Sequence, residues 1–519
     1  MQINVSYDAS VANAPSGFVA AIQQVVSLYE SLFTNNVTIN IDVGWGEVRG
    51  TPISSNAAES RSNFFNTDYA TVRGALINNA QSSVQLEADN TLPSVAQAQF
   101  GTGTSIGLTT ANAKALGLID PQGAAVDGYI GFNSSLAWSF DPNSTPVGER
   151  DFMAAAEHEI SEVMGRASSA GRAQPGNNPT WRPMDFFRFD GQGQRDLSAG
   201  APNSGSTAYF SIDNGQTSLG TWNNDPANGD LGDWQYRNGP GPNGNDAFGS
   251  SGPGRTDPLT LSDLTLMNVI GWNTAQDPAT TVPNGVLDWV ASGQSAHGMT
   301  VLSGGRQEVA GTASNTVLAG GSQQIDGGGL ALATKVEGGG TEYVDFGATA
   351  RGTTIEAGGT VNVDAGVTSG AVIDGGGEDV RGSYSLLVVG GRVIEGVARQ
   401  STINSGSEII ETGGNAVATT IGNGTLEVLS GGGLTSLELT FIGLTPAGPT
   451  PQEKYLPSVT FAAGGTGTLR LDDSVDLLKP DAAFAPGIHQ PAGRPSTGSF
   501  PTWSPLRASA AATGSTSRT

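Results

Sequence analysis

Regularly spaced glycine pairs constrain the C-terminal half of this chain more than any other feature. The pairs recur at 304–305, 320–321, 339–340, 358–359, 376–377, 390–391, 413–414 and 431–432. Successive pairs from Gly321 to Gly377 are separated by 19, 19 and 18 residues. Short β-branched segments such as Thr354–Glu356 lie between them. This period predicts a β-solenoid, whose coils bury a few Val and Ile side chains and turn at glycines with positive φ.

The position of the repeats indicates five regions. We expect an α+β domain at 1–278, a linker at 279–295, a β-solenoid of Gly-rich repeats at 296–440, a short cap-like β segment at 441–479 and a disordered tail at 480–519. The first region mixes helical and strand periodicity. The linker contains proline and glycine, and the tail is rich in Pro, Ser, Thr, Ala and Gly.

The charge and cysteine content exclude several functions. With 24 Lys and Arg against 48 Asp and Glu, the net charge of −24 argues against a nucleic-acid partner. The absence of cysteine excludes disulfides, thiol catalysis and Cys-ligated zinc. No run of about 20 apolar residues predicts a membrane span. We see no cleavable signal peptide, because the first basic residue is Arg49. The low charge content still favours a secreted or cell-surface protein over a cytoplasmic one.

One predicted helix, over 146–164, carries the residues with the clearest chemical signature. Thr145 and Gly165 are the residue types expected at its two ends. At about 100° per residue, His158, Glu159 and Glu162 share an arc beside the buried face.

This arc has the arrangement of a zinc hydrolase site. Two ligands at i and i+4, His158 and Glu162, can bind one zinc ion, and Glu159 is placed to act as general base. Zn²⁺ is therefore the expected cofactor. The other two histidines lie outside this domain, so the third ligand should be a carboxylate or a tyrosine. We favour Asp185, with Asp190 and Asp213 as alternatives.

The motif resembles that of the metzincins, a family of secreted zinc proteases. His158, Glu159, Glu162 and Gly165 match the pattern His-Glu-x-x-His-x-x-Gly-x-x-His/Asp, with Glu162 replacing the second histidine. The family's third-ligand position falls on Ser168, which is a poor ligand.

Two flanking segments extend this resemblance over about residues 1–275. The stretch 128–140 resembles the edge strand and loop that precede the family's active helix, and that edge strand pairs with peptide substrate. The segment 263–272 resembles the closing part of the domain. By resemblance, Met267 would lie beneath the metal in a Met-turn, and the fold would be a zincin-like α+β domain.

The solenoid region resembles the repeats of AIDA-type autotransporter passengers. The resemblance is carried by coils such as EGGGTEYVDFGATARGTTIEAGGTVNVDAGVTSGAVIDGGG and covers about 145 residues. It implies an exported or surface protein and contact with a cell surface or matrix through the solenoid.

Five acids in the segment 213–246 suggest a second ion. They lie among Asn and Gly residues at Asp213, Asp225, Asp230, Asp233 and Asp246. Oxygen ligands in flexible loops can bind Ca²⁺. The same residues are more typical of ordinary turns, which we favour.

Two functional hypotheses follow. The first is a secreted zinc-dependent endopeptidase that hydrolyses protein or peptide substrates with metal-activated water and carries a passenger-type solenoid. The second is a non-catalytic surface or adhesion protein with a degenerate protease domain. Bound zinc and cleavage that depends on Glu159 distinguish them.

Overall fold

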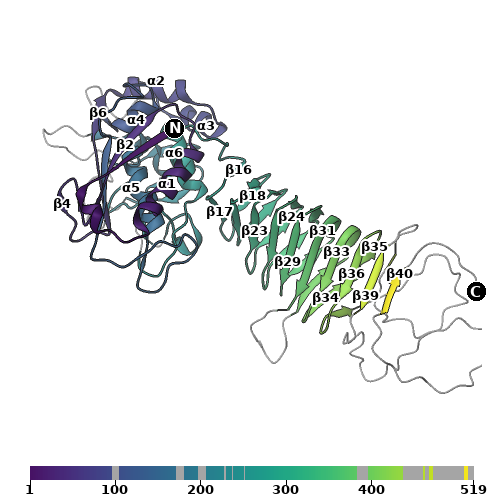
Figure 1. Cartoon of the computed structure of the whole chain (residues 1–519). Helices are drawn as coiled ribbons and strands as arrows, with labels where there is room; N and C mark the ends of the chain where they lie inside the picture. The colour runs from purple at the N-terminus through teal and green to yellow at the C-terminus, as the bar shows by residue number, and fades with distance from the viewer. Residues whose placement is uncertain are drawn as a thin grey trace, which may run out of the picture. The chain divides into compact units, whose positions relative to one another are not determined.

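The chain folds into two compact units, Met1–Trp289 and Val290–Thr519 (Figure 1). The computed structural model describes residues 1–95, 105–170, 180–196, 206–226, 229–236, 238–249, 252–382, 395–435, 460–461, 467–471 and 508–511.

The N-terminal unit contains both helices and strands, as expected for an α+β domain. Its helices are α1 (Phe18–Leu32), α2 (Tyr69–Asn79), α3 (Ser83–Thr91), α4 (Thr110–Ala115), α5 (Phe152–Met164) and α6 (Leu261–Val269), with short 3-10 helices at Ala9–Asn13, Pro183–Phe187 and Pro242–Gly244. Its strands are β1 (Gln2–Tyr7), β2 (Thr38–Trp45), β3 (Glu47–Val48), β4 (Thr51–Pro52), β5 (Ala58–Ser62), β6 (Phe64–Thr67), β7 (Ser105–Thr109), β8 (Gly128–Phe132), β9 (Trp138–Ser139), β10 (Arg150–Asp151), β11 (Thr180–Trp181), β12 (Arg188–Gly191), β13 (Gln194–Arg195), β14 (Tyr209–Phe210), β15 (Gly220–Thr221) and β16 (Thr281–Val282).

A four-stranded sheet with the order β1-β2-β8-β5 organises this unit. The first three strands are parallel, and β5 runs antiparallel to β8. An aromatic cluster joins α1, β8 and α5: Phe152 lies 5.2 Å from Phe18 and 4.6 Å from Phe132 between ring centroids. All three rings are completely buried. The motif helix α5 is therefore held against the sheet by its own first turn.

The edge strands of this sheet are β1 and β5, and β5 is the one that packs on α5, which corrects the expectation from the sequence. Residues 128–140 were expected to supply the edge strand, but β8 lies between β2 and β5. The glycines of β8 explain its interior position. A Cβ at Gly128 would meet the Val163 side chain at 2.5 Å, and one at Gly131 would meet the Glu47 carbonyl oxygen at 2.1 Å. Only residues without a side chain allow such close packing on both sides.

Helix α5 is shorter at its start than its sequence pattern predicts. It begins at Phe152, and Asp151 caps it by accepting a hydrogen bond from the Ala154 backbone N–H. The residues before it include Gly148, whose φ of 93° is incompatible with a helix. The C-terminal end is as expected, because Gly165 is the C-cap with a φ of 121°.

The C-terminal unit is a parallel β-solenoid, as the glycine period predicts. Its strands are β18 (Ser295–His297), β19 (Thr300–Leu302), β20 (Arg306–Val309), β21 (Thr312–Ser314), β22 (Val317–Ala319), β23 (Ser322–Ile325), β24 (Leu330–Leu332), β25 (Lys335–Val336), β26 (Thr341–Val344), β27 (Thr349–Arg351), β28 (Thr354–Glu356), β29 (Thr360–Asp364), β30 (Val367–Ser369), β31 (Val372–Arg381), β32 (Gly396–Arg399), β33 (Thr402–Ile410), β34 (Gly414–Val417), β35 (Thr420–Ile421), β36 (Thr425–Val428) and β37 (Gly433–Thr435).

Each coil of the solenoid places equivalent side chains in the core. One completely buried ladder contains Val301, Leu318, Val336, Ile355, Ile373, Ile403 and Ile421, paired in parallel register. Gly339 and Gly358 turn the chain with φ of 84° and 81°. The period in the sequence is therefore the length of one coil.

The segments that flank the solenoid contain strands. Residues 279–295, expected to be a linker, include β16 and β17 (Leu287–Val290), because their Val and Leu side chains are buried. In the expected cap, β38 (Thr460–Phe461) and β39 (Thr468–Leu471) extend the parallel ladder by pairing with β35 and β36. The expected disordered tail lies outside the described residues except for β40 (Ala508–Ala511), which pairs with β39.

None of the described helices has the length and apolar character that a bilayer crossing requires.

Candidate metal centre

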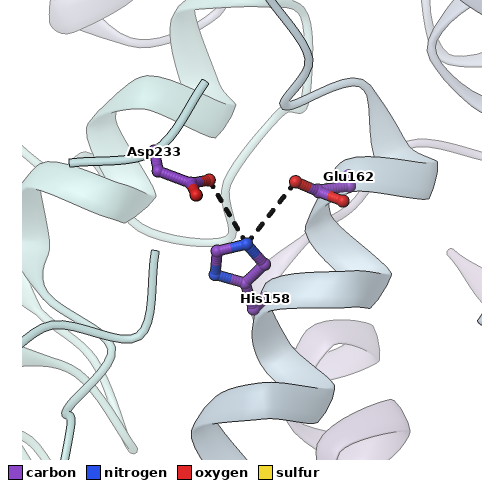
Figure 2. Close-up of side chains that lie close together, drawn as sticks. All are labelled: His158, Glu162 and Asp233. Atoms are coloured by element: carbon purple, nitrogen blue, oxygen red, sulfur yellow. Dashed lines mark ion pairs between the residues drawn. The ribbon is translucent and has the colours of Figure 1, made fainter. Parts of the chain in front are cut away.

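Helix α5 presents two candidate ligands on one face. Because they are separated by one helical turn, His158 and Glu162 project side by side, and Figure 2 shows both side chains converging. The imidazole Nε2 of His158 lies 3.5 Å from Oε1 of Glu162. This part of the site was expected from the sequence.

The third member of the cluster is Asp233, which lies in the loop after β15. Its Oδ1 atom is 3.3 Å from His158 Nε2 (Figure 2). One potential ligand atom from each of His158, Glu162 and Asp233 lies within 4.8 Å of the others. Within the described parts of the chain, no other group of three such residues meets this criterion. From the sequence, Asp233 was expected only as one of the five acids of the 213–246 segment.

The residue after Asp233 holds this loop in place. Trp234 stacks on Trp222 with ring centroids 4.4 Å apart, and its indole N–H donates to Asp263 Oδ1 at 2.6 Å. Both tryptophans are buried, with at most 1% of their surface exposed. The packing of Trp234 therefore helps to fix the position of Asp233, in addition to the contacts of the aspartate itself.

A backbone carbonyl orients the imidazole. His158 Nδ1 lies 3.0 Å from the carbonyl oxygen of Ala247, and this nitrogen must carry hydrogen to bond a carbonyl. Nε2 then faces the two carboxylates. Histidines that bind metals commonly use one nitrogen for the ion and donate the other N–H to such an acceptor.

The charges around His158 favour its protonated form when no cation is bound. Burial and the nearby Arg166 lower the pKa of His158, but Asp233 and Glu162 outweigh them and raise it well above its ordinary value. For the acids Glu162 and Asp233, burial acts in the opposite direction and raises the pKa. Their contacts with His158 and Arg166 prevail and hold both below the usual range. Both carboxylates are therefore ionised at neutral pH, which is the form that binds a cation.

Serine 60 connects the edge strand to this cluster. Its hydroxyl donates to Glu162 Oε2 at 2.6 Å, whereas Oε1 of the same carboxylate faces His158. Ser60 lies at the centre of β5, so the sheet edge runs beside the candidate ligands. The bond leaves Oε1 as the oxygen available to a cation.

Glu159 is the buried neighbour of the cluster. Its side chain interacts electrostatically with Glu162, His158, Arg166 and Asp233, and the residue is only 5% exposed. Its Oε2 atom is buried and has no hydrogen-bond partner among the described residues. Burial, with the negative charge of Glu162, raises the pKa of Glu159 well above its ordinary value. An unpartnered buried carboxylate next to three convergent ligands is expected where a further cation or a water is bound.

Asp185, which we expected as the third ligand, does not belong to the cluster. It is completely buried, and its carboxylate accepts hydrogen bonds from the Ser168 hydroxyl at 2.5 Å and from three backbone N–H groups, those of Ser169, Ala170 and Arg182. By contrast, the side chains of His158, Glu162 and Asp233 are 14%, 13% and 11% exposed, so an ion can reach them from solvent. Asp185 instead fixes the chain beyond α5.

The two alternatives for the third ligand also lie elsewhere. Asp190 is exposed and contacts the Ser206 hydroxyl at 3.5 Å. Asp213 caps its own turn by accepting hydrogen bonds from the Ser211 hydroxyl and from the backbone of Gln216 and Thr217. That arrangement agrees with the turn interpretation of this segment.

The remaining acids of the 213–246 segment form no Ca²⁺-like cluster in the described chain. Asp246 is buried and accepts hydrogen bonds from the Phe248 backbone and the Thr260 hydroxyl. Met267, expected in a Met-turn, lies inside helix α6 and is 1% exposed.

Comparison with known proteins identifies no family for this chain. No family model matches the chain, and no curated protein matches it. Among solved structures, a hyper-glycosylated fragment of TibA, modified by TibC, is similar at 24% identity. The match covers 38% of this chain and 81% of that chain, with a TM-score of 0.21.

Proposed function

We propose that the N-terminal unit is a zinc-dependent endopeptidase. The observation that carries the proposal is the convergence of His158, Glu162 and Asp233 beside the buried Glu159, whose Oε2 has no hydrogen-bond partner among the described residues. The zincin-like character of the domain is part of this proposal.

The donor set fits a zinc ion. Zinc accepts imidazole nitrogen and carboxylate oxygen, and catalytic sites use three protein ligands with a position left open. His158 would bind through Nε2, Glu162 through Oε1 and Asp233 through Oδ1, because these atoms face one another. The partial exposure of all three side chains allows water to reach the ion.

The residues around the site have distinct roles in peptide hydrolysis. Zinc, when bound, would polarise the scissile carbonyl and make the attacking water more acidic. Glu159 accepts a proton from that water and donates it to the leaving amine. The Ala247 carbonyl keeps the imidazole in the tautomer that leaves Nε2 free.

The edge strand β5 suggests how substrate is held. It is the last strand of its sheet, and Ser60 within it contacts the ligand Glu162. An extended peptide can add to such an edge by main-chain hydrogen bonds, which would place a peptide bond near the metal. This supports a protein or peptide substrate.

The solenoid would act as a spacer or as a contact with a cell surface or matrix. Its passenger-type repeat pattern supports a secreted or surface location for the protein.

Zinc content and casein cleavage by the full chain test the proposal. The expected result is one zinc per chain and cleavage that Glu159→Gln abolishes while zinc is retained. Glu157→Gln is the matched control, because Glu157 is a buried glutamate of the same helix that interacts with Asp151 and Asp263 instead. No bound zinc, or cleavage that survives Glu159→Gln, would refute the proposal.

One observation favours the non-catalytic alternative. Arg166 and a protonated His158 already pair with both carboxylates, so the cluster is charge-balanced without any metal. In that case, the domain would be a degenerate protease fold on a surface protein. A chain that binds no zinc would support this alternative.

A further inference from the structure

Arg166 is the residue through which the candidate ligands are linked. It follows the C-cap Gly165, and its side chain is completely buried. Nη1 donates to Asp233 Oδ1 at 2.8 Å, and Nη2 lies 3.4 Å from Glu162 Oε1. One guanidinium therefore bridges the two carboxylates, although Arg166 and Asp233 are 67 positions apart in the chain.

The other contacts of Arg166 fix the orientation of its guanidinium. Nε donates to the Ser161 hydroxyl at 2.7 Å, and the two terminal nitrogens donate to the carbonyls of Gly232 at 2.9 Å and His158 at 3.3 Å. The guanidinium lies over the ring of Phe248, 4.7 Å from its centroid. Such a planar, fully bonded fork is a property of arginine that lysine does not share.

The positive charge of Arg166 offsets an excess of negative charge in the proposed centre. When Glu159 is ionised and able to act as a base, it gives the centre, together with Glu162 and Asp233, one negative charge more than a divalent ion neutralises. Each carboxylate ligand also weakens the ion's ability to polarise its other ligands. A fixed positive charge that bonds to both carboxylate ligands withdraws part of their charge from the ion.

We propose that Arg166 is a positioning and charge-compensating residue of the zinc centre. It holds Glu162 and Asp233 at one point before the ion arrives, and it offsets their charge so that the bound ion stays a strong Lewis acid. This inference rests on the proposed peptidase function.

The test compares Arg166→Gln and Arg166→Lys in the full chain, with zinc affinity and casein turnover measured separately. Arg166→Gln keeps some hydrogen bonds and loses the charge. We expect zinc affinity to change little, because the lost positioning of the ligands lowers it while the lost positive charge raises it. We expect kcat to fall by about 10- to 100-fold, with little change in KM. Arg166→Lys should restore part of kcat, because it returns the charge.

Lys114→Gln is the matched control for loss of a buried cation. Lys114 is also buried, and it pairs with Asp127 at 2.7 Å. We expect this variant to be less stable but unchanged in zinc affinity per folded molecule. If Arg166→Gln does not fold, Arg166→Lys decides the question: it should bind zinc as tightly as the wild type and keep measurable turnover.

The outcomes separate the two proposals. If Arg166→Gln loses zinc affinity together with stability and Arg166→Lys restores neither zinc affinity nor kcat, Arg166 is only structural and this inference fails. Unchanged kcat in Arg166→Gln also overturns it. If the wild-type chain binds no zinc, the proposed function fails and takes this inference with it.

Discussion

Asp233 places its Oδ1 atom 3.3 Å from Nε2 of His158, and the same oxygen accepts a hydrogen bond from Arg166. The contact brings the loop after β15 onto the motif helix α5. It completes a set of three candidate ligands of which the helix itself supplies only two.

Asp233→Asn should therefore weaken zinc binding far more than Asp185→Asn. The first change replaces a negatively charged metal ligand with a neutral amide. We expect zinc affinity to fall by about 100-fold or more, since even indirect partners of metal ligands contribute 10- to 100-fold. The second replaces one of the two buried carboxylate oxygens, which together accept four hydrogen bonds, with an NH2 group that cannot accept, so it should lower Tm and leave the zinc stoichiometry intact. Equilibrium titration with a competing chelator measures both. The opposite ranking would return Asp185 to the site.

Ser60→Ala should lower zinc affinity by about 10-fold. The change removes the 2.6 Å hydrogen bond that fixes Glu162 Oε2 and lets the carboxylate rotate. Ser62→Ala is the matched control from the same strand, because the Ser62 hydroxyl contacts only the Glu162 carbonyl, at 3.5 Å. Equal zinc affinities for the two variants would show that Ser60 does not orient this ligand.

Gly128→Ala should destabilise the N-terminal unit by about 1–3 kcal/mol through overpacking. The added methyl group would lie 2.5 Å from Val163, a stiff β-branched residue of α5. Gly74→Ala is a useful contrast, since Gly74 lies within α2 and has open space where a Cβ would sit. That variant should gain up to about 1 kcal/mol. Thermal unfolding followed by tryptophan fluorescence measures the change in stability of both variants. Stabilisation by Gly128→Ala would contradict the packing of β8 on α5.

Glu342 should make the solenoid less stable as the pH rises. It is completely buried, its Oε2 accepts a hydrogen bond from Thr353, and burial raises its pKa from 4.5 to about 7. Between these values the folded state binds more protons than the unfolded state, so stability is greatest below pH 4.5 for this group and falls up to about pH 7. Burial also raises the pKa of Glu378 and Glu408, which adds to the same direction.

Glu342→Gln tests this dependence with little change in shape. Gln323 occupies the paired position in the preceding coil, so an amide is compatible with this ladder. Above pH 7 we expect the variant to be more stable by about 1–3 kcal/mol, with a weaker loss between pH 5 and pH 7. Hydrogen exchange of the β26 amides reports on this unit. Glu337→Gln, at a partly exposed position, should change stability by less than about 0.5 kcal/mol.

Much of this protein was determined by short-range pattern. The glycine period predicts the solenoid because each coil packs only on adjacent coils of nearly the same length. The buried ladder therefore follows from the spacing alone. The pair His158 and Glu162 follows from helical geometry, since residues four apart share a face. These features need no knowledge of distant contacts.

Tertiary structure decided the rest of the site. Asp233 and the edge strand β5 contact α5 from segments that are remote in the sequence, and Arg166, which follows α5 directly, reaches Asp233 across the same distance in the chain. These contacts depend on the packing of the whole unit. Asp185 and Asp233 are both acids in loop-rich sequence after the motif, and only burial distinguishes them: one is enclosed by hydrogen bonds, while the other reaches a solvent-accessible point beside His158. Spacing identifies residues on one element, but the fold selects which distant side chain completes the group.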